Sequence, residues 1–314
     1  MMDLASQMLL FMNTSDPVRG GVYHIGEGTC LALRNMAVYY AAEGLFSESS
    51  KVLVLARELF PPHSEHSNIW QLADLIIKFE KALFHGKWSK AQQMQKGISI
   101  FDVEESRLRK AQLFLNQGNF AEADNTLKKL LEECETSHTV APHFYVRALL
   151  LRAELMCTTP NYIVSLPSLM TCLAKCKAHH LLLLEAITTV QVASVQLELG
   201  LPKQALHLLD GIFISLLTHG TCYDKGCCCF LYARCLAYDA IESKDKSPDS
   251  SKKDMLAAAV SMSNRALGYF KKIKALQKMK LVLGWQAHIY NYLNMNEERN
   301  NAAYRFRNLE DELT

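Results

Sequence analysis

The sequence predicts an all-α fold: an α-solenoid of stacked helix-turn-helix repeats in a right-handed superhelical array. First, a phrase recurs that consists of glycine, any residue, an aromatic residue, any two residues and a small residue, with copies that begin at Gly44, Gly86 and Gly118. Second, most copies have a further small residue twelve positions before their last residue. Third, apolar residues recur with a helical period, and no segment alternates long enough for a strand. Repetition of one such unit is typical of solenoids.

Each part of the phrase has a physical reason. The glycine can end the first helix of a pair because it adopts a positive φ without steric cost. The two small residues let antiparallel helices approach closely where they cross, and the aromatic is expected to fill the corner between neighbouring pairs. In the second copy Phe79 replaces the upstream small residue, and in a fourth copy, at Gly200, proline replaces the aromatic. The residues predicted to define the repeats are Ala37, Gly44, Phe46, Ser49, Gly86, Trp88, Ala91, Ala111, Gly118, Phe120, Ala123, Ala153, Tyr162, Ala193, Gly200, Ala205, Ala233 and Ala287.

The phrases predict six to seven helix pairs over residues 29–314. Periodic apolar residues mark helices at 31–40, 108–115, 127–131 and 181–199. Successive glycines of the phrase are 42, 32 and 82 residues apart. The usual tetratricopeptide period is about 34 residues, so the longer spacing indicates a diverged tetratricopeptide-like array. The turns expected within the pairs are, in order, Gly44, Gly86, Gly118, Pro160, Gly200, the segment 243–254 and Asn294.

Two stretches interrupt the pattern. Residues 1–28 are interpreted as the remnant of an N-terminal helix followed by a loop, which is expected over 13–29. Residues 243–254 are polar and charged, and they predict a mobile insert within the sixth pair. This insert contains Ser247 before a proline, a minimal target for a proline-directed kinase.

Composition argues against several classes of function. The chain has 34 basic and 32 acidic residues, a formal net charge of +2, which gives no electrostatic case for a nucleic acid or membrane partner. No apolar run reaches the roughly 18 residues of a membrane span. Residues 1–12 lack the positive start of a signal peptide, so we expect a soluble intracellular protein.

No arrangement of residues indicates chemistry. The sequence contains no phosphate-binding loop, dinucleotide fingerprint, nucleophile elbow or zinc-protease motif, so it predicts no enzyme and no cofactor. The ten cysteines include no C-x2-C pair, and neither Cys172 with Cys176 nor the run 227–229 has the spacing of a structural zinc site. Cysteine is small and often buried, so we expect reduced thiols at crowded helix crossings.

Two further features bear on binding. The basic run of Lys271, Lys272, Lys274, Lys278 and Lys280 is interleaved with apolar residues. It predicts a solvated helix face, although contact with a nucleic acid or with an acidic patch of a partner stays open. A clamp for a C-terminal carboxylate resembles an Asn directly after the small residue of the first helix. The residues in those places are Val38, Gln112, Glu154 and Ser194, which argues against such a clamp.

Three segments resemble the anaphase-promoting complex subunit 5 family. They are Val195–Leu209, the stretch from Asp224 to Cys235, and the end from Glu297 to Leu309. The resemblance runs from about residue 28 to the end and consists of repeat sequence, without any catalytic motif. Members of the family carry a further N-terminal region.

The resemblance implies a non-catalytic scaffold subunit of a multi-subunit E3 ubiquitin ligase that drives mitotic exit, present in nucleus and cytoplasm. Its partners would be the complex's other scaffold subunits, with no nucleic acid, membrane or small-molecule substrate. The alternative is a free-standing tetratricopeptide adaptor that binds peptides or cargo in its concave groove. One helix pair cannot easily bury every large apolar residue near the ends, so we expect some to contact partners. The candidates are Phe11, Trp285, Tyr292, Phe306 and Leu309.

Overall fold

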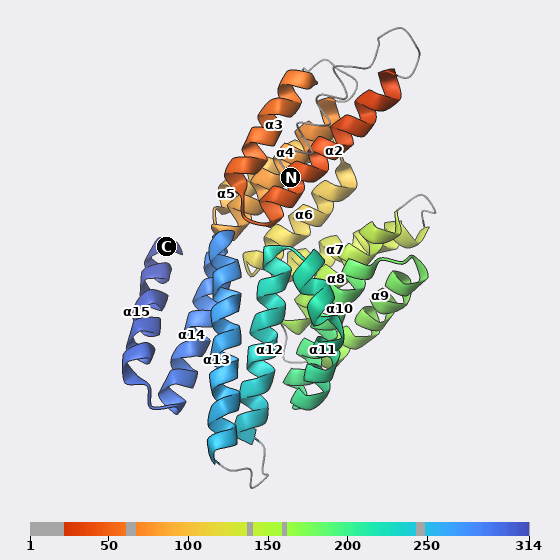
Figure 1. Cartoon of the computed structure of the whole chain (residues 1–314). Coiled ribbons are helices and arrows are strands. Elements are labelled where there is room, and N and C mark those ends of the chain that lie inside the picture. Colours follow the sequence, from red (N-terminus) through yellow and green to blue (C-terminus); the bar gives the residue numbers. More distant parts are fainter. Residues whose placement is uncertain (1–21, 61–66, 137–140, 159–161, 243–248, 314) are drawn as a thin grey trace.

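The computed structural model describes residues 22–60, 67–136, 141–158, 162–242 and 249–313, and in these ranges every regular element is a helix. The helices follow one another as seven antiparallel pairs (Figure 1), which confirms the predicted all-α repeat solenoid. The pairs are α2 (Val22–Ala42) with α3 (Phe46–Leu59), α4 (Ser67–Phe84) with α5 (Trp88–Ile98), α6 (Val103–Asn116) with α7 (Phe120–Thr136), α8 (Pro142–Cys157) with α9 (Leu166–Ala178), α10 (Leu182–Glu198) with α11 (Pro202–His219), α12 (Cys222–Glu242) with α13 (Asp249–Lys272), and α14 (Leu276–Tyr292) with α15 (Asn296–Leu313). A short 3-10 helix, η1 (Tyr162–Ser165), precedes α9.

The glycines of the phrase end the first helices of their pairs in the left-handed region. Their φ angles are 77° at Gly44, 67° at Gly86, 78° at Gly118 and 76° at Gly200. After Gly44, the amide of Leu45 donates to the carbonyl of Tyr40 over 2.8 Å. This bond to the fifth residue back is the Schellman closure of a helix end. Asn294, with φ of 59°, ends α14 in the same region, whereas the turn expected at Pro160 lies outside the described residues.

Two turns between pairs adopt the same backbone without a glycine. His180 has φ of 54° and Lys274 has φ of 53°. The amide of Leu181 donates to Cys176 O over 2.9 Å, and the amide of Ala275 donates to Phe270 O over 3.0 Å. This conformation costs a residue with a Cβ about 1–2 kcal/mol. Because neither turn contains a glycine, the sequence does not mark them.

The small residues of the phrase lie at the helix crossings. Ser49 Oγ donates to the carbonyl of Ala37 over 2.9 Å, which joins the two small positions of the first pair directly. The small residues of the later copies are buried as well, except Ala287, which is half-buried. The buried ones are Ala91, Ala111, Ala123, Ala153, Ser165, Ala193, Ala205 and Ala233.

The aromatic of the phrase behaves less uniformly. Phe46 packs on the first core cluster and lies under Lys81 of the next pair, whose Nζ is 4.9 Å from the ring centroid. Trp88 and Tyr162 are also half-buried against their clusters. Phe120, however, is 44% exposed, so in that copy the aromatic does not fill a corner.

Both predicted interruptions are shorter than expected. The loop expected over 13–29 was wrong from Val22 onward, because α2 begins there and carries Cys30 and Leu33 into the first core cluster. The insert expected over 243–254 was wrong from Asp249 onward, because α13 begins there and is anchored by buried Leu256. The remaining residues of both segments, Ser247 included, lie outside the described residues. A polar first turn of a helix faces solvent, so its composition resembles that of a loop.

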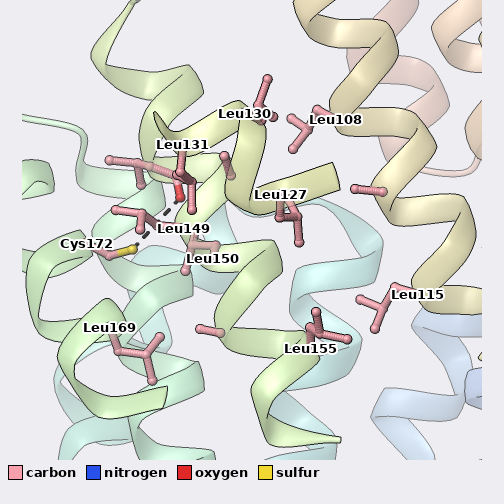
Figure 2. Close-up of a cluster of buried hydrophobic side chains, with 14 of the residues drawn as sticks. Leu108, Leu115, Leu127, Leu130, Leu131, Leu149, Leu150, Leu155, Leu169 and Cys172 are labelled. Carbon is pink, nitrogen blue, oxygen red and sulfur yellow. Dashed lines mark hydrogen bonds between the residues drawn. The ribbon is translucent and has the colours of Figure 1, made fainter. Parts of the chain in front are cut away.

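The apolar core runs through the middle of the array. Leu108 of α6 and Leu127 of α7 belong to a cluster that continues through Leu149 of α8 to Leu169 of α9 (Figure 2). The Sγ of Cys172, labelled in Figure 2, lies 3.9 Å from the carbonyl oxygen of Val146. Each pair thus buries its apolar faces against its neighbours, as expected of a solenoid.

Candidate functional site

The array curves so far that its first two pairs contact its sixth (Figure 1). Glu43, in the turn after α2, forms an ion pair with Lys225, with 2.9 Å between Oε1 and Nζ. Its other carboxylate oxygen lies 3.6 Å from the Sγ of Cys222, which donates to it. Gly44, the next residue, lies against α13: a Cβ there would be 2.6 Å from the carbonyl oxygen of Lys272. Only glycine fits this approach without displacing backbone. Glu43 and Lys225 are separated by 182 positions in the sequence, and Gly44 and Lys272 are still further apart.

Aromatic rings continue this contact. The ring of Phe84, at the end of α4, stacks on Tyr223 of α12 with centroids 5.7 Å apart and planes 14° from parallel. Tyr223 in turn meets the edge of Phe270 of α13 at 6.1 Å. Burial raises the pKa of the Tyr223 hydroxyl well above its usual range, so it stays protonated. We call the contact made by Glu43, Gly44, Phe84, Tyr223, Lys225 and Lys272 the seam.

A pocket of about 270 Å³ lies beside the seam. Its lining comes chiefly from the first helices of four pairs, α8, α10, α12 and α14, so these helices share one hollowed face. Most of the lining is apolar, and the charged groups in it are Glu154, Asp224, Arg234 and Lys278. Burial raises the pKa of Asp224, and hydrogen bonds from Thr221 offset part of that rise. Arg234 is held by Glu198 over 2.6 Å.

The pocket is poorly equipped for nucleophilic chemistry. Cys227 is its candidate nucleophile, but burial raises the pKa of that thiol to about 12. A thiol protonated at neutral pH attacks slowly. Burial likewise raises the pKa of Cys172 to about 12. Among the described residues, no three His, Cys, Asp or Glu side chains gather closely enough to hold a metal ion. The described cysteines mostly lie buried in helix crossings, as the sequence predicts.

An ion network joins the first helices of the second, third and fourth pairs. Glu105 of α6 accepts two 2.8 Å hydrogen bonds from Arg147 of α8 and one of 2.8 Å from Arg109. Arg109 also pairs with Glu80 of α4. Burial alone would raise the pKa of Glu105, but the hydrogen bonds from Arg147 and the charge of Arg109 lower it to about 2. The network fixes the relative placement of three repeats.

The predicted partner contacts divide between core and surface. Leu309 is buried, and Trp285 is half-buried and meets Phe230 edge to face at 5.7 Å. Both side chains therefore pack within the array, and their contact with a partner stays a prediction. Phe306 packs against Gly284, where a Cβ would lie 3.3 Å from the ring. Tyr292 is exposed, and Phe11 lies outside the described residues. The last pair buries its apolar residues better than expected because glycine at 284 admits a ring.

The first described helix shows the opposite behaviour. Leu31, Val38 and Tyr39 recur on one face of α2 and are 36%, 40% and 50% exposed. Leu31 and Val38 are seven residues apart, about two helical turns, and Tyr39 follows Val38 about 100° further round, so the three side chains form one wide apolar stripe. The sequence predicts that these residues belong to a periodic apolar helix at 31–40, but it does not predict that they are exposed.

The seam was also missed by sequence reasoning. Its residues carry no shared motif, and a period along the chain does not say how far the array curves. Two of the positions considered for a carboxylate clamp, Glu154 and Ser194, do line the pocket. The other two positions, Val38 and Gln112, do not line it.

Comparison with known proteins gives a consistent result. Residues 110–314 match the family model described as Suppressor of spindle checkpoint defect 1 C-terminal domain. The chain is 35% identical over 310 residues to Anaphase-promoting complex subunit 5 of Homo sapiens, and 33% and 34% identical to the proteins of that name from Gallus gallus and Rattus norvegicus. Each match takes in 98% of this chain but 40%, 40% and 42% of those proteins. The chain thus spans about two fifths of the length of the relatives it matches.

Proposed function

The chain belongs to the Suppressor of spindle checkpoint defect 1 C-terminal domain family, and from that premise we propose that it is a non-catalytic scaffold within an anaphase-promoting complex. Its relatives are named as subunit 5 of that complex, a multi-subunit E3 ubiquitin ligase that acts in mitosis. Its partners would be other scaffold subunits, in nucleus and cytoplasm. No helix of the described residues is long and apolar enough to cross a membrane.

The observation that carries this proposal is the apolar stripe on α2. Terminal repeats of a free-standing array need a polar outer face to remain soluble. Leu31, Val38 and Tyr39 instead present a surface on the first described pair that is suited to burial against another chain. A few fully desolvated side chains near the centre of an interface carry most of its binding energy, and tyrosine, here Tyr39, is among the residue types enriched at such positions.

The rest of the described chain supports a role in holding other subunits rather than in catalysis. The ion network around Glu105 and the seam fix the repeats relative to one another. A fixed array presents its outer faces at set distances, which is what a scaffold requires. The pocket offers a thiol at Cys227 whose pKa burial raises to about 12, because the charge of Lys278 and the hydrogen bond with Tyr223 offset that burial only in part.

Affinity capture of the tagged chain from dividing cells tests the proposal, with size exclusion and quantitative mass spectrometry of the eluate. We expect the chain to elute with a very large assembly that contains other subunits of the ligase. The triple variant Leu31→Ser, Val38→Ser, Tyr39→Ser should leave that assembly, because its stripe can no longer be buried favourably. Ile214→Ser removes one isolated exposed apolar side chain on α11 and serves as the control.

Either of two results would count against the scaffold. A stable pool of wild-type protein at the size of the free chain, without ligase subunits, would favour the free-standing adaptor that uses its pocket face. Retention of the triple variant in the assembly at the wild-type level would show that α2 is not a contact surface.

A further inference from the structure

Two turns that meet at the seam carry a group of lysines, and a third turn packs against them. The turn at Gly86 has Lys81 before it and Lys87 and Lys90 after it, and the turn at Lys274 follows Lys271 and Lys272 at the end of α13. These turns are far apart in the sequence, but Phe84 and Phe270 both contact Tyr223. The third turn, at Gly44, packs directly on the backbone of Lys272. We call these six lysines the seam lysine patch.

The electrostatics of His85 show that the two groups of lysines are near each other. Burial lowers the pKa of this imidazole, and the positive charges of Lys87, Lys274, Lys81 and Lys90 lower it further. Charges from both sides of the seam therefore act on one side chain. The patch exists only in the folded, curved array.

The patch is exposed and lacks counter-charges within the described chain. All six lysines are exposed, and none pairs with a carboxylate of the described residues. Glu43, the acidic residue in the adjoining turn, is already bonded to Lys225. Lys81 and Lys272 lie over the rings of Phe46 and Tyr269, contacts that leave their positive charges without a carboxylate. Of the other lysines of the predicted basic run, Lys280 pairs with Glu310, and Lys278 is half-buried over the ring of Tyr223. The chain as a whole is nearly neutral, so this positive charge is a local excess.

The chemistry of the patch selects its partner. The six positive groups are all lysine, a compact, hydrated point charge that lacks the planar fork by which arginine binds phosphates and stacks on bases in nucleic-acid recognition. Leu45 is 46% exposed in the turn that packs on Lys272 and adds an apolar contact. We propose that the seam lysine patch binds an acidic segment of a partner protein, in which Asp and Glu residues flank an aliphatic side chain.

Binding to the immobilised full-length chain, measured by biolayer interferometry, tests this proposal. The probe is a short peptide of Asp and Glu around one Leu, compared with its Asn and Gln counterpart, with a single-stranded oligonucleotide and with phosphatidylserine vesicles. We expect the acidic peptide to bind best and to weaken as salt rises from about 50 to about 300 mM, because salt screens exposed charges. The inference concerns the chain itself, so it succeeds or fails separately from assembly into the ligase.

Charge reversals on each side of the seam locate the site. Lys87→Glu with Lys90→Glu reverses the side of the second pair, and Lys271→Glu with Lys274→Glu reverses the side of the sixth pair. Each double variant should weaken peptide binding at least about 10-fold, since two attractions become repulsions. The control, Lys177→Glu with Lys203→Glu, reverses two exposed lysines elsewhere and should change binding less than about 2-fold.

Circular dichroism confirms that each variant folds, which is expected because all the substituted side chains are exposed. The proposal is overturned if the oligonucleotide or the vesicles bind more tightly than the acidic peptide, or if no acidic peptide binds at low salt. It is also overturned if the control reversal weakens binding as much as the seam reversals, or if only one side of the seam affects binding.

Discussion

Substitution of Gly44 by alanine tests whether the seam is a real constraint on the array. The added Cβ would lie 2.6 Å from the carbonyl oxygen and 2.7 Å from the carbonyl carbon of Lys272, both backbone atoms that cannot rotate away. The chain offers a matched control in Gly118. It has the same backbone, with φ of 78° against 77°, but no atom lies within 4 Å of the position of its Cβ.

The two substitutions separate two costs. Alanine in the left-handed region costs about 1–2 kcal/mol in both variants. Gly44→Ala adds an overpacking cost of about 1–3 kcal/mol unless the end of α13 moves away. We therefore expect Gly44→Ala to lower the free energy of unfolding by about 2–5 kcal/mol, and Gly118→Ala by about 1–2 kcal/mol.

Chemical denaturation gives the free energies, and hydrogen exchange shows where the strain goes. In Gly44→Ala, amides at the end of α13 and the start of α12 should exchange faster, because the seam is pushed apart. In Gly118→Ala they should exchange at the wild-type rate. Equal unfolding free energies for the two variants, together with unchanged exchange at α12 and α13, would refute the close approach of Gly44 and Lys272.

Three further predictions concern the core and the ion network. Ala123→Leu should destabilise the chain by about 1–3 kcal/mol through overpacking at a buried crossing, whereas Ala121→Leu, two residues away and exposed, should leave the denaturation midpoint unchanged; equal midpoints would place the crossing elsewhere. Glu105 has a folded pKa of about 2, below its ordinary 4.5, so its contribution is complete above about pH 4.5 and is lost as pH falls toward about 2; Glu105→Gln should flatten the acid-unfolding curve in that window, and an unchanged curve would contradict the shift. Leu309→Ala should cost about 2–5 kcal/mol as a buried side chain, while Tyr304→Ala, at a site 66% exposed, should cost little in the same melt; the reverse order would restore Leu309 as a surface contact.

The local features of the array could be predicted from the sequence, because they depend on residues close together in the chain. A glycine that ends a helix predicts one turn. A pair of small residues twelve positions apart predicts one helix crossing. Gly44 and the Ala37–Ser49 contact show both effects. The turns at His180 and Lys274 were missed because ordinary residues occupy the left-handed region there.

The candidate site could not be predicted in the same way. Whether Glu43 meets Lys225 depends on the small rotation between each pair and the next, summed over the intervening repeats. No residue pattern records that sum. The packing of the last pair was missed for a related reason, since the sequence does not show that Leu309 is buried or that Phe306 packs against Gly284. Large apolar residues near a chain end therefore predict either a partner or a well-filled core, and packing decides which.

Closure of the array at the seam limits how the chain length can vary. One residue inserted inside α6 or α8 would turn everything after it by about 100°, because a helix has 3.6 residues per turn. Glu43 and Lys225 would then no longer face each other. A residue inserted in a connection such as 99–102, between α5 and α6, can be absorbed locally without turning the later helices. Between residues 43 and 225, insertions and deletions should therefore be tolerated in the connections between helices and not within the helices, because only the latter separate the two sides of the seam.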